Sequence, residues 1–189
     1  MNKETYTAYC DILRSELIPA MGCTEPIALA LTAAIARKHL EGDVTDVHIS
    51  TSGNIIKNAK SVTVPHTNGL KGIDAACAAG IVAGDPDAGL EVLSRITPQQ
   101  QKDILEFLHT VPVTVSKATS EYLLDIEVTL QSVQHTVYAR TAQYHTGLCM
   151  IKVDGKTIFE QPVSQTTSSL DHSVLNMKEI IEFADTCNI

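Results

Sequence analysis

Tryptophan is absent from the 189 residues, and aromatic side chains make up only 4% of the chain. A core without large rings must be built from aliphatic side chains. Hydrophobic residues do reach 44%, while charged residues stay at 19%. This balance is typical of a globular protein and excludes a disordered chain. The length suffices for one ordinary domain with a hydrophobic core, or for two small lobes.

Positive charge is also scarce, because 14 Lys and Arg stand against 22 Asp and Glu and the formal net charge is −8. This balance argues against a nucleic-acid partner and against an anionic membrane surface. Residues 1–16 are polar and mixed in charge, unlike a signal peptide. The longest apolar stretch, residues 26–36, is too short to cross a bilayer. We therefore expect a cytoplasmic protein.

Cysteine is sparse and scattered, with five residues at positions 10, 23, 77, 149 and 187. The count is odd, the spacing is wide, and no pair has the short spacing of a zinc ligand set. The pattern therefore argues against a disulfide framework and fits a reducing compartment. We expect most of these thiols to be buried and inert.

Helical patterns dominate the first half of the chain. Apolar spacing, caps and breakers predict helices over residues 7–18, 25–40, 70–83, 90–95 and 97–109, with one strand over 44–51. Thr24 is the candidate cap of the second helix, and Pro26 lies just inside it. The run Ser52-Gly53-Asn54 indicates a turn.

The second half alternates as strands do. Strands are predicted over residues 111–117, 122–130, 133–143, 148–153 and 156–161, and a Ser/Thr/Gln-rich linker over 161–169 precedes an amphipathic helix over 170–187. The fold class is α+β, with helices packed on a mainly antiparallel sheet and a C-terminal helix after a linker. We expect one domain over 1–162, with 163–189 as the linker and helix that begin a cluster-binding domain. The apolar last helix needs a partner, which a homo-oligomer can also supply.

The strongest local signal surrounds Cys23. Gly22 permits a tight turn, and Cys23 falls at or just before the start of a helix. Unpaired N–H groups and the helix dipole stabilise an anion there, which lowers the pKa of a thiol. An ionised Glu25 in the same turn acts in the opposite direction. The residues leave open whether the pKa of Cys23 is lowered or raised overall. They equally fit a cysteine that serves only as a small residue at a tight helix entry.

Residues 16–26 (ELIPAMGCTEP) resemble the opening of the L-cysteine desulfidase family, which is allied to the α chain of bacterial iron–sulfur L-serine dehydratases. The similarity spans nearly the whole chain in the same order. It continues through residues 52–58 (SGNIIKN), Val64-Pro65 with Gly69 and Gly72, residues 84–86 (GDP), residues 89–93 (GLEVL), and His145-Thr146.

The resemblance implies β-elimination on a small amino acid, either L-cysteine to pyruvate, ammonia and sulfide, or L-serine to pyruvate and ammonia. It implies a [4Fe–4S] cluster as the Lewis acid, and it gives Cys23 the proton-transferring role. A thiolate held at a helix start can serve as the base that this reaction needs. The substrate-binding residues expected from the matched motifs are Thr24, Glu25, Ser52, Asn54, Lys57, Asn58, His145 and Thr146.

Several of these residues also have simpler interpretations. Lys57 and Asn58 can donate to a substrate carboxylate, but Gly53-Asn54 can equally form a plain β-turn. The loop over residues 65–69 can present N–H groups to an anion or only connect two elements. His145 can line the site beside Cys23 or simply be exposed.

One departure from the family limits what this chain can do alone. The family's cluster is held by three cysteines in a C-terminal portion, and its enzymes are more than twice this length. Here Cys10, Cys77, Cys149 and Cys187 form no cluster motif. We interpret them as structural and expect no metal ligand in this chain. A C-terminal cluster domain or a partner subunit would then complete the enzyme.

Two other functions compete with the lyase. The chain can be a non-catalytic amino-acid-binding or regulatory module that assembles with a cluster-bearing partner. It can also be a thiol hydrolase that pairs Cys23 with His145, although nothing in the sequence places these two residues together. The sequence does not separate cysteine from serine as the substrate, because that choice depends on contacts at the cluster.

Overall fold

The computed structural model describes residues 1–17, 19–163 and 172–187. The chain forms two compact units, one from residues up to 19 together with those from 164 onward, the other from Ala20–Val163. The sequence predicted a domain over 1–162, whereas the first helix belongs to the same unit as the last one. The expectation that residues 163–189 begin a cluster-binding domain stays a prediction.

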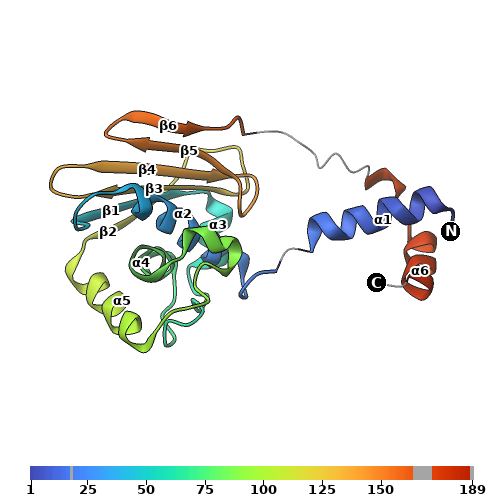
Figure 1. Cartoon of the computed structure of the whole chain (residues 1–189), viewed down its shortest axis with the longest axis horizontal. Coiled ribbons are helices and arrows are strands. Elements are labelled where there is room, and N and C mark those ends of the chain that lie inside the picture. Colours follow the sequence, from blue (N-terminus) through green and yellow to red (C-terminus); the bar gives the residue numbers. More distant parts are fainter. Residues whose placement is uncertain (18, 164–171, 188–189) are drawn as a thin grey trace. The chain divides into compact units, whose positions relative to one another are not determined.

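The larger unit contains a six-stranded sheet in the order β2-β1-β3-β4-β5-β6 (Figure 1). Strands β1 and β2 pair in parallel, and all other neighbours are antiparallel. The predicted fold class, α+β with a mainly antiparallel sheet, is therefore confirmed. The strands are β1 Asp46–Thr51, β2 Val113–Lys117, β3 Asp125–Gln131, β4 Thr136–Ala142, β5 Leu148–Val153 and β6 Lys156–Glu160.

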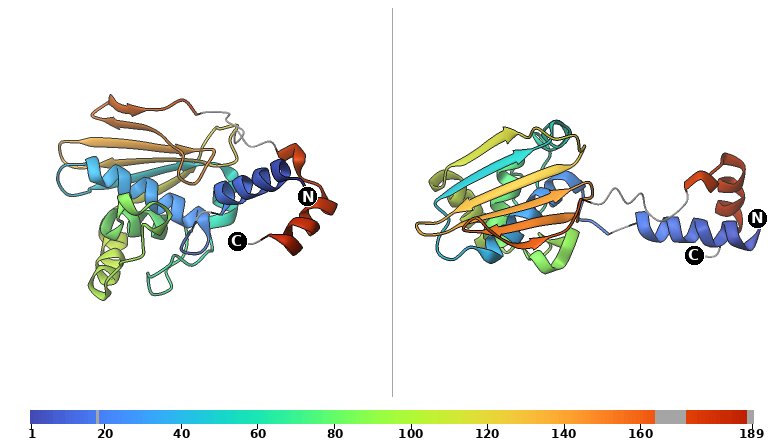
Figure 2. Two further views of the ribbon diagram at one scale, coloured as in Figure 1. Left: turned by 45° about the vertical axis from the view of Figure 1, so that its right-hand side comes forward. Right: turned by 90° about the horizontal axis from the view of Figure 1, so that it is seen from above.

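Helices of this unit lie against one face of the sheet, as the views in Figures 1 and 2 agree. Helix α2 packs both on α4 and on strands β3 and β4, so all its residues from Pro26 to Ala34 are buried. The helices are α2 Thr24–His39, α3 Gly53–Ala59, α4 Ile73–Ala83, the 3₁₀ helix η1 Pro86–Glu91, and α5 Pro98–Thr110.

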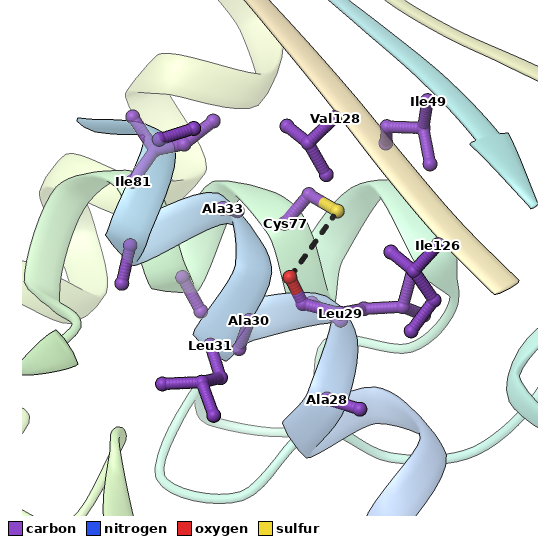
Figure 3. Close-up of a cluster of buried hydrophobic side chains, with 14 of the residues drawn as sticks. Ala28, Leu29, Ala30, Leu31, Ala33, Ile49, Cys77, Ile81, Ile126 and Val128 are labelled. Atoms are coloured by element: carbon purple, nitrogen blue, oxygen red, sulfur yellow. Dashed lines mark hydrogen bonds between the residues drawn. The ribbon is translucent and has the colours of Figure 1, made fainter. Parts of the chain in front are cut away.

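The core is aliphatic, as the composition required. Figure 3 shows Leu29 of α2 and Cys77 of α4 among the side chains of Ile126 and Val128 from β3. The Cys77 thiol is fully buried and lies 3.9 Å from the carbonyl oxygen of Leu29. Gly80 lets α4 approach α2 closely, because a Cβ atom there would lie 2.1 Å from the carbonyl oxygen of Ala30.

Some predicted boundaries differ from the structure. Cys23, not Thr24, is the N-cap of α2. The predicted turn at residues 52–54 is the start of α3, because the Ser52 hydroxyl accepts a hydrogen bond from the Ile55 amide at 3.4 Å and caps the helix. The helix predicted over 90–95 is wrong, since the helical turn lies earlier, over η1. Strand β1 joins the later strands in one sheet.

The smaller unit contains α1 Lys3–Glu16, the 3₁₀ helix η2 His172–Val174, and α6 Met177–Thr186. The ring of Phe183 contacts the rings of Tyr6 and Tyr9, with centroids 5.2 and 5.4 Å apart. The Tyr9 hydroxyl donates to the Val174 carbonyl oxygen at 3.1 Å. The helix α6 after the predicted linker is confirmed, while residues 164–171 of that linker lie outside the described part.

Candidate functional site

The candidate site begins at the tight entry to α2. Gly22 has a φ of +114°, a conformation that glycine adopts without strain. It is followed by Cys23 in extended conformation, and the helix starts at Thr24. The Cys23 side chain is exposed and makes no capping hydrogen bond to the helix backbone. The thiol is therefore held at a helix start and is accessible to a small molecule.

The carboxylate of Glu25 connects this thiol to a second helix. Cys23 Sγ donates to Glu25 Oε2 at 3.0 Å, and Asn58 Nδ2 donates to Glu25 Oε1 at 3.1 Å. Glu25 is half-buried in the first turn of α2, and Asn58 lies in the last turn of α3. One carboxylate is thus fixed through both oxygens between the thiol and an amide.

The surroundings of Cys23 and Glu25 bear on the protonation question that the sequence left open. Partial burial raises the pKa of the Cys23 thiol, and the hydrogen bond to Glu25 raises it further. The backbone amide of Glu25 lowers that pKa but does not reverse the shift. The hydrogen bond from Cys23 lowers the pKa of Glu25 in turn. At neutral pH the resting pair is a thiol and a carboxylate.

His145 is the third titratable group of the site. It lies half-buried in the loop between β4 and β5. Burial lowers the pKa of its imidazole, and Glu25 acts in the opposite direction. Its charge when protonated is one cause of the lowered pKa of Glu25. The imidazole is therefore neutral at neutral pH, and it lies close enough to interact with the Glu25 carboxylate.

The other predicted site residues are not joined to this group by the hydrogen bonds of the described residues. Ser52 is 4% exposed, and its hydroxyl donates to the Leu123 carbonyl oxygen at 2.6 Å, so it is occupied within the fold. Thr24 is half-buried at the start of α2. Asn54, Lys57 and Thr146 are exposed.

The structure adds one contact that the sequence did not predict, at Lys117, and it places the 65–69 loop of the matched motifs beside the turn before Cys23. A Cβ atom on Gly53 would lie 3.3 Å from Lys117 Cε, which places this lysine against the start of α3. A Cβ atom on Gly22 would lie 3.7 Å from Pro65 Cγ, so the loop after α3 borders the turn before Cys23. Lys117 was not expected there because the parallel pairing of β1 with β2, which brings Thr51 opposite Lys117, could not be predicted from the sequence.

The described residues do not provide the ligands of an iron–sulfur cluster. Within residues 1–17, 19–163 and 172–187, no group of three or more His, Cys, Asp or Glu side chains could hold a metal ion. Cys77 and Cys149 are buried on separate elements of the larger unit, and Cys10 and Cys187 belong to the smaller one. In the same ranges, no helix is long and apolar enough to cross a membrane.

Comparison with known proteins finds relatives of greater length. The chain is 40% identical to a UPF0597 protein of Treponema denticola over 98% of this chain and 44% of that one. It is 44% identical to a UPF0597 protein of Desulfitobacterium hafniense over 97% of this chain and 43% of the relative. The chain thus spans less than half the length of these curated relatives. No protein-family profile and no solved structure matches it.

The shared name UPF0597 states no reaction, substrate or cofactor, and it refers to neither cysteine desulfidase nor serine dehydratase. Sequence identity therefore relates this chain to the UPF0597 proteins. The resemblance to the desulfidase and dehydratase enzymes rests on the motifs alone.

Proposed function

We propose that this chain is the thiol-bearing part of a lyase that catalyses β-elimination on L-cysteine or L-serine. The observation that supports this function most strongly is the hydrogen-bonded group of Cys23, Glu25 and Asn58, with the neutral imidazole of His145 beside it. An accessible thiol, a carboxylate fixed at both oxygens and a neutral base are the parts that proton transfer requires.

The reaction needs a group that accepts the α-proton and a route by which a proton reaches the leaving group. Cys23 is the proton-transferring residue of the proposal, because its sulfur is exposed and held at a defined point. The elimination yields an aminoacrylate, which water converts to pyruvate and ammonia. The proposed substrate-binding residues remain those of the matched motifs, namely Thr24, Glu25, Ser52, Asn54, Lys57, Asn58, His145 and Thr146.

The [4Fe–4S] cluster that the resemblance implies does not fit the described residues of this chain. The proposal therefore gives this chain only the proton transfer and part of the amino-acid pocket. The cluster would belong to a domain or subunit corresponding to the part of the relatives that this chain does not match. We also propose that the protein is cytoplasmic.

A non-catalytic module that binds a small amino acid is the second candidate. The raised pKa of Cys23 favours it, because a resting thiol is a weak base and a weak nucleophile. The separated positions of the other cysteines favour it as well. Under this alternative the chain would bind L-cysteine or L-serine without converting either.

A chimera tests the lyase directly. This chain would replace the matching region of the longer Desulfitobacterium hafniense protein, followed by anaerobic reconstitution with iron and sulfide. Release of sulfide and pyruvate from L-cysteine, or of pyruvate and ammonia from L-serine, would support the proposal. A folded chimera that shows cluster absorbance, binds either amino acid and releases no product would favour the binding module instead. The intact relative, treated identically, is the control for reconstitution.

A further inference from the structure

The smaller unit buries only one edge of the apolar face of α6. The helix has ten residues, and a helix of that length is marginally stable by itself in water. Its stability must therefore come from packing. The packing on α1 centres on Phe183, which is 7% exposed and contacts the rings of Tyr6 and Tyr9.

The rest of that apolar face is exposed. Met177 is 71% exposed, Ile180 39% and Ile181 57%. With Ala184, which is also exposed, these residues recur three and four positions apart and form one stripe along the helix, called the α6 stripe below. Leu175, just before the helix, is 40% exposed as well. Contiguous exposed apolar side chains of this kind mark an interaction site.

The spacing of the α6 stripe indicates what kind of partner fits it. Apolar residues at positions i, i+3, i+4 and i+7 are the anchors through which one helix packs against another. The charged residues of α6 lie outside the stripe and do not interrupt it, namely Lys178, Glu179, Glu182 and Asp185. The surface therefore fits a helix with an apolar face of its own.

The UPF0597 relatives indicate where such a helix comes from. The match to the Treponema denticola protein covers 98% of this chain, which leaves about four of its 189 residues unmatched. Helices α1 and α6 therefore lie within the match, apart from a few residues at most. More than half of each relative lies outside the matched region. That length of chain is enough for several helices.

We propose that the α6 stripe is a docking surface for a helix from the segment that lies outside the matched region of the UPF0597 relatives. The inference rests on the exposure of the stripe and on the length of the relatives. It does not depend on whether the assembly is a lyase. A second copy of this chain, or another part of the same chain, would be a different occupant, and the test separates both from the proposed one.

Thiol labelling measures whether the stripe is covered. Ile181→Cys places a thiol in the stripe, and Lys178→Cys, on the flank of the same helix, is the matched control. Labelling with N-ethylmaleimide would be followed by peptide mass spectrometry in this chain and in the chimera with the Desulfitobacterium hafniense protein. In this chain alone both thiols should react at similar rates.

The chimera should change only one of these rates. There Ile181→Cys should react at least about tenfold more slowly than in this chain, because the thiol becomes accessible only when the interface opens. Lys178→Cys should keep its rate. Equal reactivity of Ile181→Cys in this chain and in a folded chimera would overturn the proposal. The labelling does not depend on turnover, so an inactive chimera counts against the lyase and not against the docking surface.

Light scattering of this chain alone identifies the other occupants. A dimer in which Ile181→Cys is protected would assign the stripe to a second copy. A monomer in which it is protected would assign the stripe to the chain itself. Both results would contradict the proposal.

Co-expression provides a second test that does not require the chimera to fold. The unmatched segment of the Desulfitobacterium hafniense protein would be co-expressed with this chain carrying an affinity tag. The segment should co-purify with the wild type and with Lys178→Asp, and Ile181→Asp should abolish co-purification. A segment that does not co-purify with the wild type, or that co-purifies equally with Ile181→Asp, would refute the docking surface.

Discussion

Replacement of Gly80 by alanine should destabilise the larger unit, although alanine is the better helix former. Gly80 lies in the interior of α4, where that helix crosses α2. A Cβ atom there would lie 2.1 Å from the carbonyl oxygen of Ala30 and 2.8 Å from its carbonyl carbon. These are backbone atoms of a buried helix, so no side chain can rotate away to make room.

The size of the effect follows from two opposing contributions. The helices must separate by about 1 Å to restore a tolerable contact, and overpacking of this kind costs about 3 kcal/mol at the upper end of its usual range. The higher helix propensity of alanine offsets about 1 kcal/mol of that cost. The net loss is about 2 kcal/mol, equivalent to a fall in Tm of roughly 4–8 °C for a protein of this size.

Urea unfolding followed by circular dichroism measures this difference, with Gly53→Ala as the matched control. Gly53 is also helical, but the nearest atom to its Cβ position is the end of the flexible Lys117 side chain at 3.3 Å. The control should stay within about 0.5 kcal/mol of the wild type, as surface substitutions usually do. Equal stability of Gly80→Ala and the wild type would refute the close approach of α2 and α4.

Three further predictions concern stability. Arg140→Met should lower the free energy of unfolding by about 3 kcal/mol in urea. The fully buried Asp125 would lose the two hydrogen bonds that it accepts from Arg140 at 2.9 and 2.7 Å. A loss below about 1 kcal/mol would contradict this expectation. Thr97→Ala should cost about 1 kcal/mol through loss of the capping box of α5, and an unchanged urea midpoint would show that the cap is dispensable. The hydrogen bond to Asp154 raises the pKa of His135, so its contribution is complete below the unfolded pKa and is lost as pH rises through the folded one. The stability advantage of the wild type over His135→Gln should therefore be larger at pH 5.5 than at pH 8.5.

Elements with strong local signals could be predicted from the sequence. Helix α5 begins at the Thr97-Pro98 cap, and its predicted and observed spans nearly coincide. Helix α3 was missed because Ser52-Gly53-Asn54 has the composition of a turn. Its start depends on a distant partner, since the Ser52 hydroxyl that caps the helix also donates to the Leu123 carbonyl oxygen. No periodicity in a seven-residue segment reveals such a contact.

The candidate site shows the same limit. Cys23 and Glu25 lie in one turn, so their opposition was visible in the sequence, but its outcome depended on burial and on the 3.0 Å contact between them. Asn58 and His145 were expected near Cys23 only through the family resemblance. The hydrogen bond of Asn58 to Glu25 and the electrostatic coupling of His145 to it required the packing of α3 and of the β4–β5 loop beside α2.

The most direct test of the central claim is turnover of L-cysteine by the reconstituted chimera with and without the Cys23 thiol. Sulfide and pyruvate would be followed anaerobically for the parent chimera and for Cys23→Ala at equal cluster content. Loss of a group that transfers the substrate proton should lower kcat by about 10²–10⁴-fold. A Cys23→Ala chimera that turns over L-cysteine at the parent rate would contradict the account.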